Sequence, residues 1–307
     1  MNIISLVLAF LIETFRPLPA GHAVHSLFSR YAANVAMQFN SGERGQGIIG
    51  WLVAVGPWVL GTALVHAIAD SAGWLLELAF NVAVLYFLVG FQQISTGFGA
   101  VLSALRDDDA DGARRAFSEW RGQDADDLEA SELAKLAIEN SLASAHRHLF
   151  GVMFWFVVLP GPVGAVLYLF AALLAERWGL DRGEEYVAFG SFSRQAFEVL
   201  DWIPARLTAA TFAIVGNFED AVFCWRTQSN DWGDAGQGVV LAAGAGALGV
   251  RLGETIHQDG TAVFRPELGV GDAAGVDKMA GAMELVRRSV LIWLFLIGLL
   301  TLAVWAG

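Results

Sequence analysis

The residues best placed to do chemistry are charged side chains inside otherwise apolar stretches. Asp201 and Arg206 interrupt the apolar run 199–225, which has the length of a membrane span. Charges at such depth are costly and are tolerated when they face other helices or water. An arginine fork suits recognition of a phosphate or carboxylate group. The run therefore predicts one wall of a polar, anion-binding site. The alternative is a structural ion pair buried in a helix bundle.

The elements that must position these side chains are helices. We predict that residues 199–225 form one helix with an inward polar stripe and with Pro204 in its first turn, where a missing N–H breaks no hydrogen bond. Upstream, the segment 128–147 is rich in helix formers. Glu139 and Arg147 share one face of it, because they lie about two turns apart.

The composition predicts a polytopic membrane protein of the all-α class. Of 307 residues, 55% are hydrophobic and 16% are charged, and the mean hydropathy is +0.51. We expect a single membrane domain over residues 1–307. Its four hydrophobic segments are 47–69, 74–91, 149–175 and 289–306, and its helical cytoplasmic parts are 1–45, 92–148 and 176–288. The first 45 residues carry arginines ahead of the first span, which places this end on the cytoplasmic side.

The third hydrophobic segment contains Pro160-Gly161-Pro162 at its centre. It forms either one kinked span or two short helices in a re-entrant hairpin. Positive residues before it and Arg287-Arg288 before the last segment both belong on the cytoplasmic side. We therefore favour the hairpin.

Several classes of function have no support in the sequence. The net charge is −12 and no basic patch stands out, which argues against nucleic-acid binding. The single Cys224 excludes a multi-cysteine metal site and is expected to be a buried, inert thiol. His22 and His25 have chelating spacing but lack a third ligand, and we expect the aspartates 107–109 to cap a helix. We predict no metal site, and the sequence does not identify a cofactor.

Two glycine-containing segments also have a structural interpretation. Gly244-x-Gly246-x-x-Gly249 matches a dinucleotide-binding pattern, but no strand pattern precedes it, so we predict close helix packing. Residues 257–272 have turn composition and are expected to form an ordered loop.

Three segments, 137–168, 189–209 and 246–253, resemble the CobD/CbiB family, the membrane adenosylcobinamide-phosphate synthases. The resemblance implies an all-helical inner-membrane fold. It also implies ATP-driven amide formation between a corrinoid carboxylate and an amino-alcohol phosphate. Several residues of the family pattern are kept, in part or in full: Glu139, Tyr168, Glu198, Pro204 and Arg206. Other polar positions of that pattern carry different residues here: Ala143, Ser144, Arg147, Leu169, Ala172, Leu173, Leu174, Ala175, Glu176, Arg194, Gln195 and Phe197.

The segments VLDWIPARL and AIVG are similar to the AmpE branch of the same superfamily. Glu13, Arg147 and Val276-Asp277-Lys278 also fit that branch, whose members are regarded as inner-membrane signalling modulators.

From these resemblances we expect an AmpE-like regulatory or sensing protein of the bacterial inner membrane, multi-pass and without synthase activity. The alternative is a synthase-like, ATP-dependent amide ligase of cobalamin biosynthesis. The expected partners of this protein are the lipid bilayer and an anionic small molecule. The sequence also allows a protein partner or a homo-oligomer. The ligand pocket is predicted at the cytoplasmic membrane boundary. Its expected binding residues are Glu13, Glu139, Arg147, Tyr168, Glu198, Asp201 and Arg206.

Overall fold

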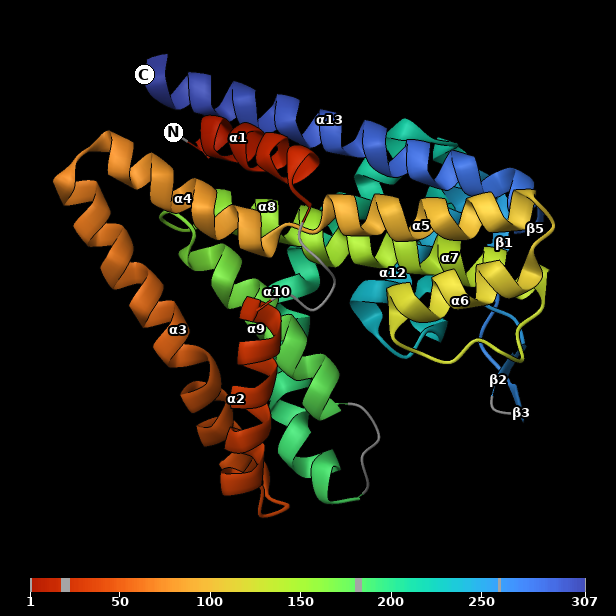
Figure 1. Cartoon of the computed structure of the whole chain (residues 1–307), viewed down its shortest axis with the longest axis horizontal. Helices are drawn as coiled ribbons and strands as arrows, with labels where there is room; N and C mark the ends of the chain where they lie inside the picture. The colour runs from red at the N-terminus through yellow and green to blue at the C-terminus, as the bar shows by residue number, and fades with distance from the viewer. Residues whose placement is uncertain (1, 18–22, 180–183, 259–260, 307) are drawn as a thin grey trace. The chain divides into compact units, whose positions relative to one another are not determined.

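The computed structural model describes residues 2–17, 23–179, 184–258 and 261–306. It is predominantly helical, which confirms the all-α class (Figure 1). The chain divides into two compact units, each built from separated segments. The first unit contains residues 1–90, 147–202 and 294–307, and the second contains residues 91–146 and 203–293. Whether they act as one membrane domain stays a prediction.

Three apolar helical stretches in the described part of the chain are long enough to cross a membrane. They are Arg44–Ala72, Trp74–Arg106 and Val276–Val304. Most of their apolar surface is exposed: Leu60 and Leu64, for example, are 71% and 64% accessible. Exposed leucines at this density are what a lipid-facing helix requires. These stretches overlap three of the four predicted hydrophobic segments: 47–69, 74–91 and 289–306.

The first unit consists of helices on either side of a long hairpin. Helices α3 (Arg44–Ala72) and α4 (Trp74–Leu88) meet at Gly73, whose φ of 125° a residue with a side chain rarely adopts (Figure 1). Helices α1 (Asn2–Phe15) and α2 (Ala23–Phe39) pack against α4 and α3 respectively. The Phe28 ring stacks on Phe170 at 4.0 Å, which fixes α2 against the following hairpin.

The third predicted hydrophobic segment, 149–175, instead forms two helices, α8 (Gly151–Val158) and α9 (Val163–Gly179). They run antiparallel, because Gly151 packs against Tyr168 and Gly164 packs against the carbonyl of Trp155. A side chain at either glycine would collide with its neighbour. The segment therefore forms two helices and not one kinked span, as predicted. Re-entry of this hairpin into the membrane stays a prediction. Helix α7 (Ala130–Ala145) leads into α8 through a π-helical turn, His146–Phe150.

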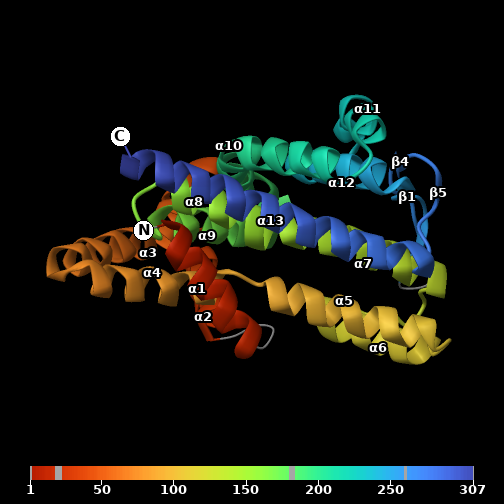
Figure 2. The same ribbon diagram turned by 90° about the horizontal axis from the view of Figure 1, so that it is seen from above.

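The second unit is built around α12 (Ala235–Leu248), which is buried along most of its length. A helix that is apolar all round belongs in a core. Gly246 lies against the backbone of Asp220 and Ala221, and Gly249 ends the helix at φ 64°. The prediction of small-residue packing is therefore confirmed. Helix α11 (Phe218–Gln228) lies beside α12 (Figure 2).

Helices α5 (Phe91–Arg106) and α6 (Ala110–Arg121) pack together in the same unit, and α5 also contacts α7. Asp109 caps α6 by accepting a 2.8 Å hydrogen bond from the Gly112 amide, which confirms the capping prediction for the last of the aspartates 107–109.

Three expectations about the second half of the chain were wrong, and two of them concern residues 199–225. Residues 199–225 form parts of two helices, α10 (Glu184–Val215) and α11, because the chain turns at Gly216 and Asn217 caps α11. Pro204 lies inside α10 and not in its first turn.

The expected loop 257–272 instead contains short strands. β2 (Ile256–Gln258) pairs antiparallel with β3 (Thr261–Val263). β1 (Val250–Leu252) lies between β4 (Leu268–Gly269), which is antiparallel to it, and β5 (Asp272–Ala273), which is parallel. Helix α13 (Val276–Ala306) follows, and like α10 it contributes to both units.

Candidate functional site

A buried polar contact in the first unit joins α9 to α10. The Tyr168 hydroxyl donates a 2.6 Å hydrogen bond to Oδ1 of Asp201. Tyr168 is fully buried and Asp201 is 3% exposed. A buried carboxylate needs hydrogen-bond donors in place of water, and the phenol hydroxyl of Tyr168 is such a donor. The structure thus gives Asp201 a buried polar partner, Tyr168, whereas a polar, anion-binding wall around Asp201 stays a prediction.

Arg147 extends this contact toward the surface. Its guanidinium lies 5.6 Å from the centre of the Phe197 ring, and that ring lies 5.5 Å from the ring of Tyr168. On its other side, Nη1 of Arg147 lies 3.6 Å from Oε2 of Glu176. Arg147 belongs to the π-helical turn, a distortion frequent at functional sites. We name Arg147, Tyr168, Phe197 and Asp201 the Tyr168 cluster.

The other predicted site residues of this unit have different surroundings. Glu13 lies in α1 and is only 2% exposed, so it is buried as expected for an inward-facing acid. Glu198 follows Phe197 on α10 but is exposed. The structure thus brings Arg147, Tyr168 and Asp201 together, and it leaves Glu198 on the surface of α10.

Glu139 is the centre of a second polar group, in the second unit. Its carboxylate accepts two hydrogen bonds from Arg265, of 2.5 Å and 3.2 Å, and one of 2.8 Å from the Gly253 amide. Arg265 also donates to the carbonyl of Gly253 and lies against Trp232. This saturated pair holds the segment after α12 onto α7. We name Glu139, Gly253 and Arg265 the Glu139 cluster.

A neighbouring ion pair reinforces the same contact. The ammonium of Lys135, one turn before Glu139, binds the carboxylate of Glu254. Glu254 has a φ of 62°, which is unfavourable for a residue with a side chain. The two ion pairs therefore hold a strained turn in place.

Burial and ion pairing act in opposite directions on Glu139. Burial raises the pKa of its carboxyl group above the usual value, while Arg265, the Gly253 amide and Lys135 favour the charged form. Because Arg265 already makes hydrogen bonds to protein acceptors, we interpret the Glu139 cluster as a structural clamp.

Arg206 also belongs to the second unit, where it is half-buried on α10. Each unit therefore contains part of the predicted set: Glu13, Arg147, Tyr168, Glu198 and Asp201 in the first, Glu139 and Arg206 in the second. A single pocket that includes all of them stays a prediction.

Sequence patterns assigned no role to Arg265 or Lys135, and they marked Phe197 only as a departure from the family pattern. Arg265 lies in a segment of turn composition, 126 residues from its partner Glu139, and only the folded chain brings them together. His22, half of the weak chelating pair, lies outside the described residues. Among the described residues, no group of three His, Cys, Asp or Glu side chains is placed to hold a metal ion. Cys224 is fully buried, which confirms that part of the prediction, and burial raises the pKa of its thiol to about 11, as expected for an inert thiol.

Comparison with known proteins identifies the family. The family model described as CobD/Cbib protein matches residues 6–286. The chain belongs to the CobD/CbiB family. Among curated CobD/CbiB relatives, "Cobalamin biosynthesis protein CobD" of Stutzerimonas stutzeri (strain A1501) is 34% identical over 274 residues, which cover 88% of each chain. The protein of the same name from Chromobacterium violaceum is 36% identical over 237 residues, 75% of each chain. No solved structure gives a significant match.

These findings confirm the family but do not support the branch that we expected within it. The reported relatives carry the name of the cobalamin biosynthesis protein, and the narrower AmpE-like assignment has no support from them. The expectation of a regulatory protein without enzymatic activity is likewise unsupported. The comparisons favour the alternative, an enzyme of cobalamin biosynthesis.

Proposed function

We propose that this CobD/CbiB protein is a multi-pass enzyme of the bacterial inner membrane that forms an amide bond in cobalamin biosynthesis. It joins a corrinoid carboxylate to the amine of an amino-alcohol phosphate and consumes ATP. The observation that carries this proposal is the similarity to a curated cobalamin biosynthesis protein over 88% of both chains. The apolar helices long enough to cross a membrane support the location.

The Tyr168 cluster is the part of the first unit that best suits this reaction. ATP converts the carboxylate into an acyl phosphate, and the amine then displaces phosphate. The attacking ammonium must first lose a proton, and a positioned carboxylate such as Asp201 can accept it. Tyr168 holds that carboxylate in place through its 2.6 Å hydrogen bond.

Arg147 supplies the charge that the second substrate requires. Its contact with Glu176 is 3.6 Å long, and its side chain is 24% exposed. The planar guanidinium can bind two oxygens of a phosphate group in bidentate fashion. We assign Arg147 to the phosphate of the amino alcohol.

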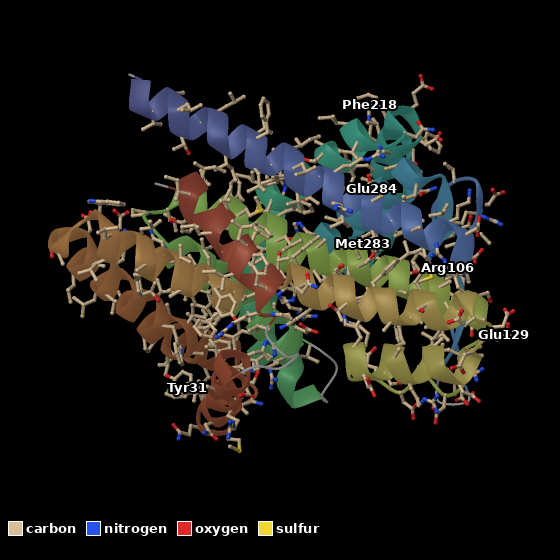
Figure 3. All side chains as sticks on the ribbon, turned by 45° about the horizontal axis from the view of Figure 1, so that its top comes forward. Tyr31, Arg106, Glu129, Phe218, Met283 and Glu284 are labelled. Atoms are coloured by element: carbon tan, nitrogen blue, oxygen red, sulfur yellow. The ribbon has the colours of Figure 1, made fainter. Side chains whose placement is uncertain are left out.

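The test is release of ADP by the purified full-length protein in detergent. We expect release to require ATP, the corrinoid acid and the amino-alcohol phosphate together. Asp201→Asn should lower turnover about 100-fold or more, the range typical of a lost proton acceptor. Glu284→Gln, at an exposed position of α13, is the matched control and should leave turnover unchanged (Figure 3). ADP release that is absent, or that does not depend on the corrinoid acid, would contradict the proposal.

A second candidate is a protein that binds these substrates without joining them. The composition of α9 favours this candidate, because the family pattern has a lysine and other polar residues at positions that are apolar here. Here Leu169, Ala172 and Leu174 are buried in apolar packing. Loss of polar groups at such positions removes donors that would surround the phosphates. Calorimetric binding of the amino-alcohol phosphate without ADP release would favour this candidate over the enzyme.

A further inference from the structure

A basic depression lies between α2 and α9 of the first unit, separate from the side chains assigned to catalysis. Its volume is about 420 Å³. The residues that line it are His25, Ser26, Ser29, Arg30, Ala33 and Arg177. None of these lining residues carries a carboxylate, so the depression presents two guanidinium groups and several hydrogen-bond donors.

Ser29 is the observation that points to a ligand. It is 6% exposed, and its Oγ atom is buried without a hydrogen-bond partner in the described part of the chain. Other buried helical hydroxyls, such as those of Ser193 and Ser289, donate to a backbone carbonyl one turn earlier. A buried hydroxyl left without a partner is unfavourable, so a partner from outside the chain would stabilise it.

The helix that carries Ser29 is firmly held. Tyr31, labelled in Figure 3, donates a 2.7 Å hydrogen bond to the carbonyl of Val53 on α3. Phe28 stacks on Phe170 of α9. Because packing fixes α2 against both neighbours, the spacing between Ser29 and Arg177 does not depend on a ligand.

The charges around the depression favour an anion. Arg30 and Arg177 both line it, and Arg30 makes only a 3.4 Å contact with the carbonyl of Ser26. Burial and the nearby Arg177 lower the pKa of His25, while Glu176 opposes this shift. The imidazole is therefore neutral at pH 7 and carries one N–H group. Two guanidinium groups, a hydroxyl and an imidazole are the donor set of a phosphate site.

We propose that this depression binds a phosphate-class oxyanion, with Arg30 and Arg177 as the charged partners and Ser29 and His25 as neutral donors. The oxyanion is the phosphate group of a soluble metabolite or of a lipid headgroup. The proposal does not depend on amide formation, because oxyanion binding here can hold whether or not the protein is a synthase.

The test uses the full-length protein and inorganic phosphate as the probe. Phosphate is titrated at constant ionic strength, and its dissociation constant is obtained from the shift in thermal unfolding midpoint. We expect Arg177→Gln to weaken phosphate binding about tenfold or more. Arg226→Gln, at an exposed arginine of α11 in the second unit, is the control and should bind as the unmodified protein does.

Ser29→Ala separates a ligand site from a packing role. We expect its phosphate affinity to fall about threefold or more, while its unfolding midpoint without phosphate stays equal or rises, since an unpaired buried hydroxyl is removed. This variant also tests the proposal if Arg177→Gln does not fold. A lower midpoint with unchanged phosphate affinity would show that Ser29 serves packing alone and would overturn the proposal.

A second arm identifies the source of the oxyanion. The protein is placed in nanodiscs of phosphatidylcholine alone or with added phosphatidate. A lipid headgroup is supported if phosphatidate stabilises the protein and inorganic phosphate does not. This stabilisation should be lost in both Ser29→Ala and Arg177→Gln. Stabilisation by inorganic phosphate supports a soluble ligand. If neither probe acts, or if Arg226→Gln loses as much as Arg177→Gln, the depression is not an oxyanion site.

Discussion

The Tyr168 hydroxyl and the Asp201 carboxylate meet at 2.6 Å inside the first unit, where both side chains are almost completely buried. The contact ties the helical hairpin α8–α9 to α10. Gly151 makes it sterically feasible, because a Cβ atom at this position would meet the Tyr168 ring. The same contact thus serves packing and, in the proposed reaction, holds the proton acceptor.

Removal of the phenol hydroxyl should destabilise the protein measurably. We expect Tyr168→Phe to lower the free energy of unfolding by about 1–3 kcal/mol, because a buried carboxylate loses a donor. Denaturant unfolding in detergent measures this change. Tyr86→Phe removes a hydroxyl that donates to the Arg16 carbonyl at an exposed site, and it should cost less. Equal costs for the two variants would show that burial of Asp201 does not matter.

The Glu139 clamp should show strong coupling between its partners. Arg265→Gln leaves the buried Glu139 carboxylate without its charged partner, and we expect a loss of about 3–5 kcal/mol. Glu139→Gln with Arg265→Gln should cost less than the sum of the single changes, because no unpaired charge remains. The exposed pair Glu284–Arg288 is the control, and its coupling should be below about 1 kcal/mol. Additive losses at Glu139 and Arg265 would contradict the clamp.

Cys224 should resist alkylation in the folded protein. It is fully buried and its thiol has a pKa of about 11, so little thiolate is present near neutral pH. We expect maleimide to label it only after unfolding, with mass spectrometry as the measurement. Rapid labelling of the native protein would place Cys224 in an accessible position, against the packing of α11 on α12.

His25 should make stability depend on pH. Its pKa is lowered from the ordinary 6.5, so the unfolded chain binds the proton more readily. This contribution to stability is present above pH 6.5 and is lost as the pH falls toward the lower, folded pKa. The unfolding midpoint should therefore drop between about pH 7.5 and 5.5.

The charged groups that act on His25 are Arg177 and Glu176 of α9, and Arg30 lies in the same depression. His25→Gln should reduce the drop in midpoint, and sulfate should oppose it by favouring the charged imidazole. An identical pH profile for His25→Gln would show that this residue does not titrate in the assumed environment.

Sequence patterns predicted the helices and the family better than they predicted the site. Hydropathy located α3, α4 and α13, and Pro160-Gly161-Pro162 located the turn between α8 and α9, because length and helix breaking are local properties. The division of residues 199–225 at Gly216 was missed because the apolar run continues across Gly216-Asn217, where Asn217 caps α11 and Gly216 lies against the Ala247 carbonyl.

The contact partners of the predicted site residues could be identified only from the folded structure. Glu139 was singled out as a ligand-binding acid, but Arg265 reaches it only because the strands after α12 return to α7. The Tyr168–Asp201 contact likewise requires α9 and α10 to pack side by side. The family resemblance included Tyr168 without giving the atom that it contacts.

The most direct test of the central proposal is mass analysis of the corrinoid after incubation with the purified protein, ATP and the amino-alcohol phosphate. We predict a new species with the mass of the amide, formed only when all three substrates are present and strongly reduced in Asp201→Asn. Unchanged corrinoid acid after prolonged incubation, with protein that remains folded and binds the substrates, would contradict amide formation by this protein.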